Sequence, residues 1–290
     1  MDSNIDTTRS KMTNGIDRLI ELNRVHSTLF SDPGNSLSRR RYRGEHPTEI
    51  TFLKCMDGRL NGSIITETPL GIIQPFRNIG GKFNLGWSHF GDEISGWIKY
   101  STQRGRNCLI FVTYHFSEGD KHRGCRGFDY DRESAMDFAR KLKGDFDNDF
   151  GKGAVYTIQA GIETDFDAII LHGENGEIWD LAKEVNSSEI YLISKLRQFY
   201  PKMPERTILD FLPLIQGNIR HVAKIKSENR PIIDAKHREW VIGIGRGFDW
   251  FHLINAALIV GPFDPDLDTA IETAARLVKN NLDEERIPRE

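Results

Sequence analysis

The chain has 290 residues, of which 38% are hydrophobic and 10% aromatic, so it is long enough for one large or two ordinary domains. Its formal net charge of −3 excludes a chain that binds nucleic acid through overall positive charge. No apolar run approaches the roughly 18 residues of a membrane-spanning helix, and the polar start lacks the apolar stretch of a signal peptide. We therefore expect a soluble, cytoplasmic protein that binds neither nucleic acid nor membrane.

The first 47 residues are expected to lie outside the main folded part. Residues 1–12 are polar and predict a tail, and the apolar spacing over residues 14–30 predicts an amphipathic helix. Residues 31–47, rich in Ser, Pro, Gly and Arg, predict a linker. Its arginine run, residues 39–43, could bind an acidic partner or be simply solvated.

Residues 48–150 are expected to form one domain with the order strand, loop, strand, strand, helix. Apolar runs predict strands over residues 49–54 and 108–115. The helix is predicted over residues 131–143, with Asp131 as its N-cap.

Residues 151–290 are expected to form a second domain, a diverged copy of the first. Strands are predicted at residues 154–159, 167–172 and 240–245, and helices at 187–200, 206–217 and from Asp264 onward. We expect the aromatic residues at 248–252 to pack against the first domain. Strands that alternate with helices predict an α/β fold with a mostly parallel sheet flanked by helices.

Three residues carry the chemistry that the sequence suggests. Cys55 follows the first predicted strand, His115 ends the second, and Cys125 lies ten residues further on. Two thiolates and one imidazole suit Zn²⁺, and three protein ligands leave a fourth position open for water, as in catalytic zinc sites. Three cysteines do not make a disulfide framework. The remaining cysteine, Cys108, lies inside an apolar strand, so we expect it in the core.

Asp57 and Arg59 distinguish an enzyme from a scaffold. Both lie beside Cys55, where Asp57 could orient a metal-bound water and Arg59 could keep Asp57 ionised. A non-catalytic zinc-stabilised scaffold, the competing hypothesis, would need only the ligands.

The motifs resemble those of β-class carbonic anhydrases over about residues 48–145. Cys55-Met-Asp57-Gly-Arg59 is similar to the Cys-x-Asp-x-Arg signature of that class, and Arg77-Asn-Ile-Gly-Gly81 to the Arg-Asn-Ala-Gly-Asn segment after it. The segment from Tyr114 to Cys125 resembles the carboxysomal, shell-associated branch. The resemblance implies a β-carbonic-anhydrase-like sheet, with a second copy that lacks the metal site.

The resemblance leaves two histidines open as the ligand. The carboxysomal branch uses the histidine at the strand end, here His115, whereas the His-x-x-Cys pattern of ordinary β-class enzymes selects His122. Because a strand end holds a ligand more rigidly than a loop, we favour His115 and expect His122 and Gly124 near the site. Gln74 is a candidate bicarbonate contact, as a glutamine is in the β class.

The resemblance implies reversible hydration of CO₂ to bicarbonate by zinc-bound hydroxide, in a homo-oligomer. A related zinc hydrolase acting on another small substrate, such as carbon disulfide, is the alternative enzyme. A carboxysome is the alternative location. Carboxysomal enzymes carry a longer N-terminal part than the 47 residues found here, which favours the cytoplasm.

Overall fold

The computed structural model describes residues 24–25, 28–86, 88–151, 153–184, 186–231 and 283. The chain divides into two compact units, Met1–Ser36 with Trp240–Glu290, and Leu37–Glu239. The predicted helix over residues 14–30 lies largely outside the described residues. The strand predicted at 240–245, the aromatic group at 248–252 and the helix predicted from Asp264 lie outside them altogether.

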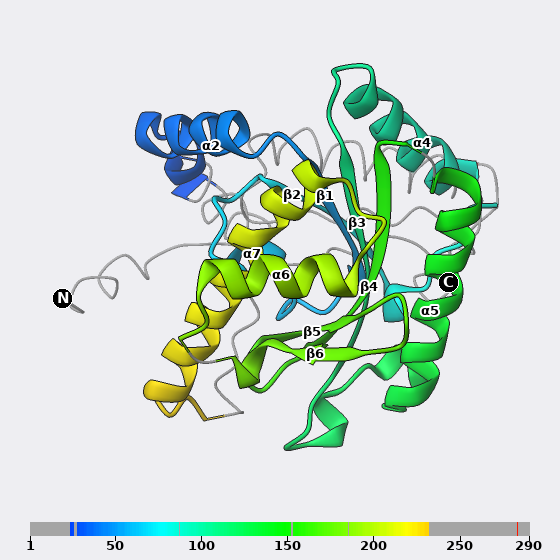
Figure 1. The fold of residues 1–290 in the computed structure, drawn as a ribbon. Helices are drawn as coiled ribbons and strands as arrows, with labels where there is room; N and C mark the ends of the chain where they lie inside the picture. The colour runs from blue at the N-terminus through cyan, green and yellow to red at the C-terminus, as the bar shows by residue number, and fades with distance from the viewer. Residues whose placement is uncertain are drawn as a thin grey trace. The chain divides into compact units, whose positions relative to one another are not determined.

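A six-stranded sheet in the order β2-β1-β3-β4-β5-β6 forms the centre of the larger unit (Figure 1). The strands are β1 (Glu49–Cys55), β2 (Ile73–Asn78), β3 (Cys108–Phe116), β4 (Val155–Glu163), β5 (Ala168–His172) and β6 (Ile178–Asp180). β1 pairs in parallel with both β2 and β3, and β3 pairs in parallel with β4. The last two pairings are antiparallel. The predicted α/β class with a mostly parallel sheet flanked by helices is confirmed.

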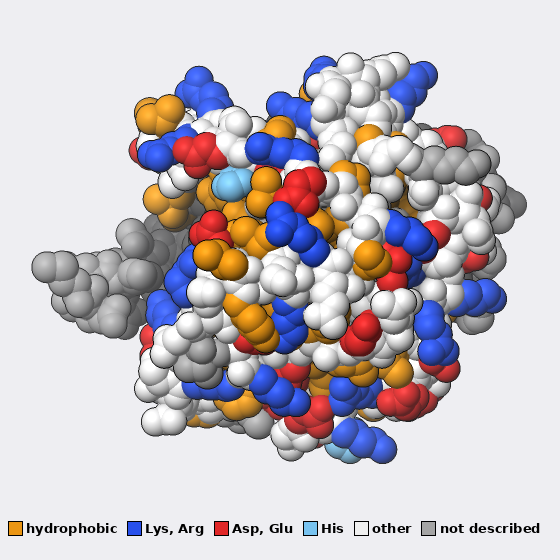
Figure 2. Space-filling view, viewed as in Figure 1, with side chains coloured by type: hydrophobic (Ala, Val, Ile, Leu, Met, Phe, Trp, Pro, Cys, Tyr) orange, Lys and Arg blue, Asp and Glu red, His pale blue; other side chains and the backbone are white. Residues whose placement is uncertain are grey.

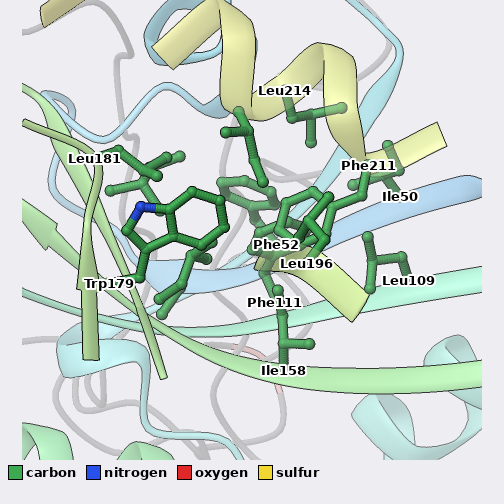
Figure 3. Close-up of a cluster of buried hydrophobic side chains, with 14 of the residues drawn as sticks. Ile50, Phe52, Leu109, Phe111, Ile158, Trp179, Leu181, Leu196, Phe211 and Leu214 are labelled. Atoms are coloured by element: carbon green, nitrogen blue, oxygen red, sulfur yellow. The ribbon is translucent and has the colours of Figure 1, made fainter. Parts of the chain in front are cut away.

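Alternate residues of the central strands face opposite sides of the sheet, so each side has its own core. One core contains Phe52 and Phe111 together with residues of α6 (Glu189–Phe199) and α7 (Glu205–Ser227). The rings of Phe111 and Phe211 meet edge to face with centroids 5.2 Å apart. Figure 3 shows this core, with Trp179 from β6 beside the strand residues and the side chains of α7. The continuous apolar runs of β1 and β3 thus reflect burial on both faces.

The opposite core lies between the sheet and the helices α4 (Ser88–Thr102) and α5 (Arg132–Phe150). It contains Leu53, Ile110 and Val112 from the strands, which alternate with the residues of the first core. Cys108 is fully buried in it, as the sequence predicts. Asp131 caps α5 by accepting hydrogen bonds from the backbone N–H groups of Glu133 and Ser134, which confirms the predicted N-cap.

Short elements connect the strands and helices. They are α3 (Gly62–Ile65), η1 (Ile79–Gly81), η2 (Lys121–Arg123), η3 (Arg126–Phe128) and η4 (Leu181–Lys183). α3 lies against α7, where a Cβ atom at Gly217 would be 1.9 Å from the carbonyl oxygen of Thr66. Glycine at this position therefore allows the two helices to approach closely.

The linker predicted over residues 31–47 is wrong, because most of it forms the helix α2 (Pro33–Glu45). Pro33 occupies the first helical position, which needs no N–H donor, and the Asp32 carboxylate accepts hydrogen bonds from the N–H groups of Gly34 and Asn35. Arg41 and Glu45 add an ion pair one turn apart. Composition suggested a linker, but these local contacts stabilise a helix.

The helix α4 is absent from the predicted order of residues 48–150. Its buried side chains, Ile94 and Ile98, are spaced four residues apart, with the partly buried Phe90 and Trp97 on the same core. The apolar spacing of a helix was therefore present in the sequence.

The boundary expected between residues 150 and 151 does not separate two sheets. β4 pairs with β3 from Cys108–Val155 to Phe116–Glu163, so residues after 151 extend the first sheet. The strands predicted at 154–159 and 167–172 and the helices predicted at 187–200 and 206–217 are present, but they complete the same unit. The diverged second copy predicted over residues 151–290 is therefore not confirmed.

Side chains of both charge signs alternate over the visible face of the molecule, with apolar side chains between them (Figure 2). Blue side chains gather over α2, which contains the arginine run. Within the described part of the chain, no helix is both long and apolar enough to cross a membrane.

Candidate metal centre

Cys55, His115 and Cys125 lie together at one end of the sheet. Cys55 is the last residue of β1 and His115 the last but one of β3. The two strands are parallel, so their carboxyl ends meet at the same edge, and Cys125 comes from the loop that follows β3. The two Sγ atoms and a ring nitrogen of His115 all lie within 4.8 Å of one another. Among the described residues, this is the one group of at least three such side chains that could hold a metal ion.

All three side chains are removed from solvent, with exposed fractions of 7%, 2% and 3% for Cys55, His115 and Cys125. Neither ring nitrogen of His115 has a hydrogen-bond partner. An unsatisfied buried polar group costs about 1–3 kcal/mol, so these two ring nitrogens favour a further binding partner. A metal ion among the three side chains would provide it.

The pKa values of the two thiols shift in opposite directions. The Cys125 thiol donates a hydrogen bond to Cys55 and, with His115 nearby, holds the pKa of Cys55 well below its usual range despite burial. The same hydrogen bond and the charge on Cys55, together with burial, raise the pKa of Cys125. A bound cation would favour loss of both protons, because metal ligation requires thiolates. The donor set, two sulfurs and one nitrogen, therefore fits zinc.

Asp57 and Arg59 form a bidentate ion pair beside Cys55. Arg59 Nη2 lies 2.5 Å from Asp57 Oδ2, and Arg59 Nε lies 3.0 Å from Oδ1. Burial alone would raise the pKa of Asp57, but the bonds from Arg59, with the nearby His115, hold it below its usual range. Burial alone would lower the pKa of Arg59, but Asp57, Cys55 and Asp165 together raise it. Asp57 therefore stays ionised.

Two glycine contacts pack the surrounding loops against the cluster. Gly81 has a φ of +65°, and a Cβ atom there would lie 3.3 Å from the backbone nitrogen of Cys55. A Cβ atom on Gly127, two residues after Cys125, would lie 2.7 Å from Gly80 Cα. The glycines in the loops after β2 and after Cys125 thus allow these backbones to meet beside the metal group.

The structure places His122 away from the cluster and Gly124 directly beside it. His122 is exposed on η2, and its ring lies 5.3 Å from that of Tyr130 rather than among the cysteines. Gly124 is buried next to Cys125, where a Cβ atom would lie 3.0 Å from the carbonyl oxygen of Lys121.

The structure does not bring Gln74 to the cluster within this chain, and its contact with bicarbonate stays a prediction. Gln74 is exposed on β2 and pairs with Thr51, whereas Asn78 pairs with Cys55. Gln74 and Asn78 are four positions apart, which is about 13 Å along the strand.

Sequence reasoning missed two buried carboxylates at the same end of the sheet. Glu163 ends β4, opposite Phe116, and Asp165 follows two residues later. They are 6% and 3% exposed. Two acidic residues directly after an apolar strand were the available signal.

Residues 42–202 match the profile of a protein family described as carboxysome shell carbonic anhydrase, catalytic domain. The match includes β1 to β6 and all residues of the candidate centre. It covers more than half of the chain.

Curated relatives have the same description. A carboxysome shell carbonic anhydrase of Prochlorococcus marinus strain MIT 9313 is 28% identical over 259 residues, covering 75% of this chain and 49% of the relative. One from Hydrogenovibrio crunogenus is 26% identical over 247 residues, covering 71% and 46%. The chain thus spans about half the length of the curated relatives it matches.

A solved structure, the β-carbonic anhydrase CcaA, aligns over 59% of this chain and 93% of its own, at 15% identity and a TM-score of 0.40. That likeness is too weak to assign the fold.

Proposed function

This chain belongs to the carboxysome shell carbonic anhydrase family, and from that premise we propose that it is a zinc-dependent enzyme for the reversible hydration of CO₂ to bicarbonate. One observation carries the proposal. The buried group of Cys55, His115 and Cys125 lies beside an ionised Asp57 that is fixed by Arg59. A scaffold that used the metal only for stability would not need this ion pair.

In the proposed reaction, one group of residues would bind the metal and another would orient the water. Cys55, His115 and Cys125 would hold the zinc, and their burial excludes bulk water from the ligands. Zinc, when bound, supplies a Lewis acid that makes water a nucleophile near neutral pH. Arg59 holds the pKa of Asp57 below its usual range, so Asp57 would act as an ionised acceptor that takes a hydrogen bond from the attacking water and orients it. Arg59 keeps that carboxylate ionised and in position. The proton released on hydration leaves to solvent.

The test combines metal analysis with stopped-flow CO₂ hydration on the purified whole protein. We expect about one zinc per chain and hydration that a chelator abolishes and added zinc restores. Bound zinc without CO₂ hydration would instead support the scaffold, or an enzyme for another small substrate. Carbon disulfide hydrolysis, assayed in parallel, separates those two.

Location and assembly are part of the same proposal. The relatives are named as carboxysome shell carbonic anhydrases. We propose that this chain acts in the cytoplasm, either free or in a carboxysome, and that it forms a homo-oligomer. Fractionation of cells with an antibody against the whole protein distinguishes the two locations, and analytical ultracentrifugation gives the oligomeric state.

A further inference from the structure

The loop that joins His115 to Cys125 contacts two carboxylates of a neighbouring strand end. Asp165 Oδ1 accepts a hydrogen bond from Ser117 Oγ at 2.6 Å, and its Oδ2 accepts one from the backbone N–H of Gly119 at 2.7 Å. The Ser117 hydroxyl in turn accepts from the N–H of Asp120 at 3.0 Å. The first turn of the loop is therefore organised around one buried carboxylate.

Asp165 is itself held in place. Its backbone N–H donates to Glu163 Oε1 at 2.9 Å, and the N–H of Phe166 donates to Glu163 Oε2 at 3.0 Å. The N–H and hydroxyl of Thr164 both donate to the carbonyl oxygen of Phe116, at 2.9 and 3.1 Å. The end of β4 is thus fixed to the end of β3 where the loop begins.

The far end of the same loop reaches Arg59. Arg59 Nη2 donates to the carbonyl oxygen of Arg123 at 2.7 Å, two residues before Cys125. The same nitrogen binds Asp57. An ordered loop therefore places both a ligand residue and the acceptor that orients the Asp57–Arg59 pair.

We propose that Asp165 is a positioning residue of the metal centre, which fixes the loop between His115 and Cys125. This inference rests on the proposed function for its catalytic consequence, but its structural part does not. Asp165 acts through Ser117 and Gly119, and it is not one of the three candidate metal ligands. Because hydrogen bonds to charged groups are among the stronger ones in proteins, losing both should loosen the loop.

Asp210 offers a matched control. It is 1% exposed, and its Oδ2 accepts from the N–H and the hydroxyl of Thr48, at 2.9 and 2.6 Å. Both carboxylates thus accept from a backbone N–H and a hydroxyl and are similarly buried, and Asp210 in addition pairs with Arg206, so its loss should cost at least as much stability. Thr48 directly precedes β1, so Asp210 lies at the strand end opposite the metal centre. Loss of either carboxylate should lower stability, but only loss of Asp165 should alter the metal site.

The experiment compares the wild type with Asp165→Ala, Asp165→Asn, Ser117→Ala and Asp210→Ala. Three quantities are measured below the unfolding transition: zinc release to a chelator, tryptic cleavage after Lys121 or Arg123 by mass spectrometry, and kcat and KM for CO₂. We expect Asp165→Ala to raise zinc release and loop cleavage by about 10-fold or more, and to lower kcat. Asp165→Asn, which keeps the acceptor for Ser117, and Ser117→Ala should show smaller changes in the same direction. They keep the test decisive if Asp165→Ala fails to fold.

Equal zinc release and equal loop cleavage in the Asp165, Ser117 and Asp210 variants would overturn the proposal. A wild-type protein that does not hydrate CO₂ would contradict the proposed function, but it would leave the role of Asp165 testable. If the wild type binds zinc but does not hydrate CO₂, zinc release and loop cleavage still test Asp165. If it binds no zinc, loop cleavage alone does so.

Discussion

The Arg59 guanidinium binds both carboxylate oxygens of Asp57, through Nη2 at 2.5 Å and Nε at 3.0 Å. Only 8% of the Arg59 side chain and 14% of the Asp57 side chain are exposed. The backbone N–H of Arg59 also donates to Asp57 Oδ1 at 2.9 Å. The spacing of two residues thus closes a small ring that fixes the carboxylate next to Cys55.

Removal of either partner should abolish most CO₂ hydration while zinc remains bound. We expect Asp57→Ala and Arg59→Ala to lower kcat/KM by about 100-fold or more, because an oriented acceptor is lost. Arg59→Lys should recover little, since lysine lacks the planar fork. Stopped-flow assays and metal analysis check both quantities. Arg140→Ala, which breaks an exposed pair with Asp137, is the control and should retain full activity. Full activity in Asp57→Ala would show that Asp57 does not orient the water.

Zinc binding should depend on His115 and not on His122. We expect Cys55→Ser, Cys125→Ser and His115→Ala to lose zinc on dialysis against a chelator, because each loses a buried donor atom. His122→Ala should retain about one zinc per chain, since His122 is exposed on η2. Metal-to-protein ratios give the answer. The opposite result for the two histidines would reverse the assignment of the ligand.

Two glycine-to-alanine substitutions should have opposite effects on stability. A Cβ atom at Gly217 would lie 1.9 Å from the carbonyl oxygen of Thr66, so Gly217→Ala must push α7 and α3 apart. We expect it to lower the free energy of unfolding by about 2–3 kcal/mol or more. Gly144 in α5 has open space around its Cβ position, and Gly144→Ala should stabilise the protein by about 0.5–1 kcal/mol. Urea unfolding measures both. A neutral Gly217→Ala would mean that the two helices are not in close contact.

The stability of the protein should fall in acid partly because of His172. Its Nε2 atom lies 2.9 Å from the Tyr114 hydroxyl, and burial, with the charges of Arg132 and Arg140, lowers its pKa from 6.5 to about 4. The unfolded chain takes up a proton near pH 6.5, whereas the folded chain resists until about pH 4. The contribution of His172 is therefore present above pH 6.5 and is lost as the pH falls from 6.5 to 4.

His172→Gln should flatten this pH dependence, because glutamine does not titrate and can still bond the Tyr114 hydroxyl. The measurement is the urea midpoint at several pH values across the window, compared with His122→Gln as an exposed control. If the wild type and His172→Gln show the same slope with pH, His172 is not the group responsible.

The sequence by itself determined the features that depend on neighbouring residues. Apolar runs identified β1 and β3, because buried parallel strands need apolar side chains on both faces. Asp131 marked the start of α5, because an N-cap acts within one turn. The spacing of Asp57 and Arg59 predicted their pairing, which closes over two residues. The sequence also identified Cys55 and Cys125 as members of the metal group, and it left His115 and His122 as candidates for the third member.

Only the tertiary structure decided which distant residues meet. The register between β1 and β2 places Asn78, not Gln74, beside Cys55. Local composition does not determine this register, because the same strand sequences could pair with a different offset. The structure groups His115 rather than His122 with the cysteines, because His115 lies on β3, which is parallel to β1, whereas His122 is exposed in the following loop. The first turn of that loop bonds to Asp165, in the turn after β4. The continuation of one sheet through β4 to β6 likewise depends on pairing between strands, whereas helix and strand order alone fits one sheet or two. Contacts between residues far apart in sequence carry this information, and a local pattern does not contain it.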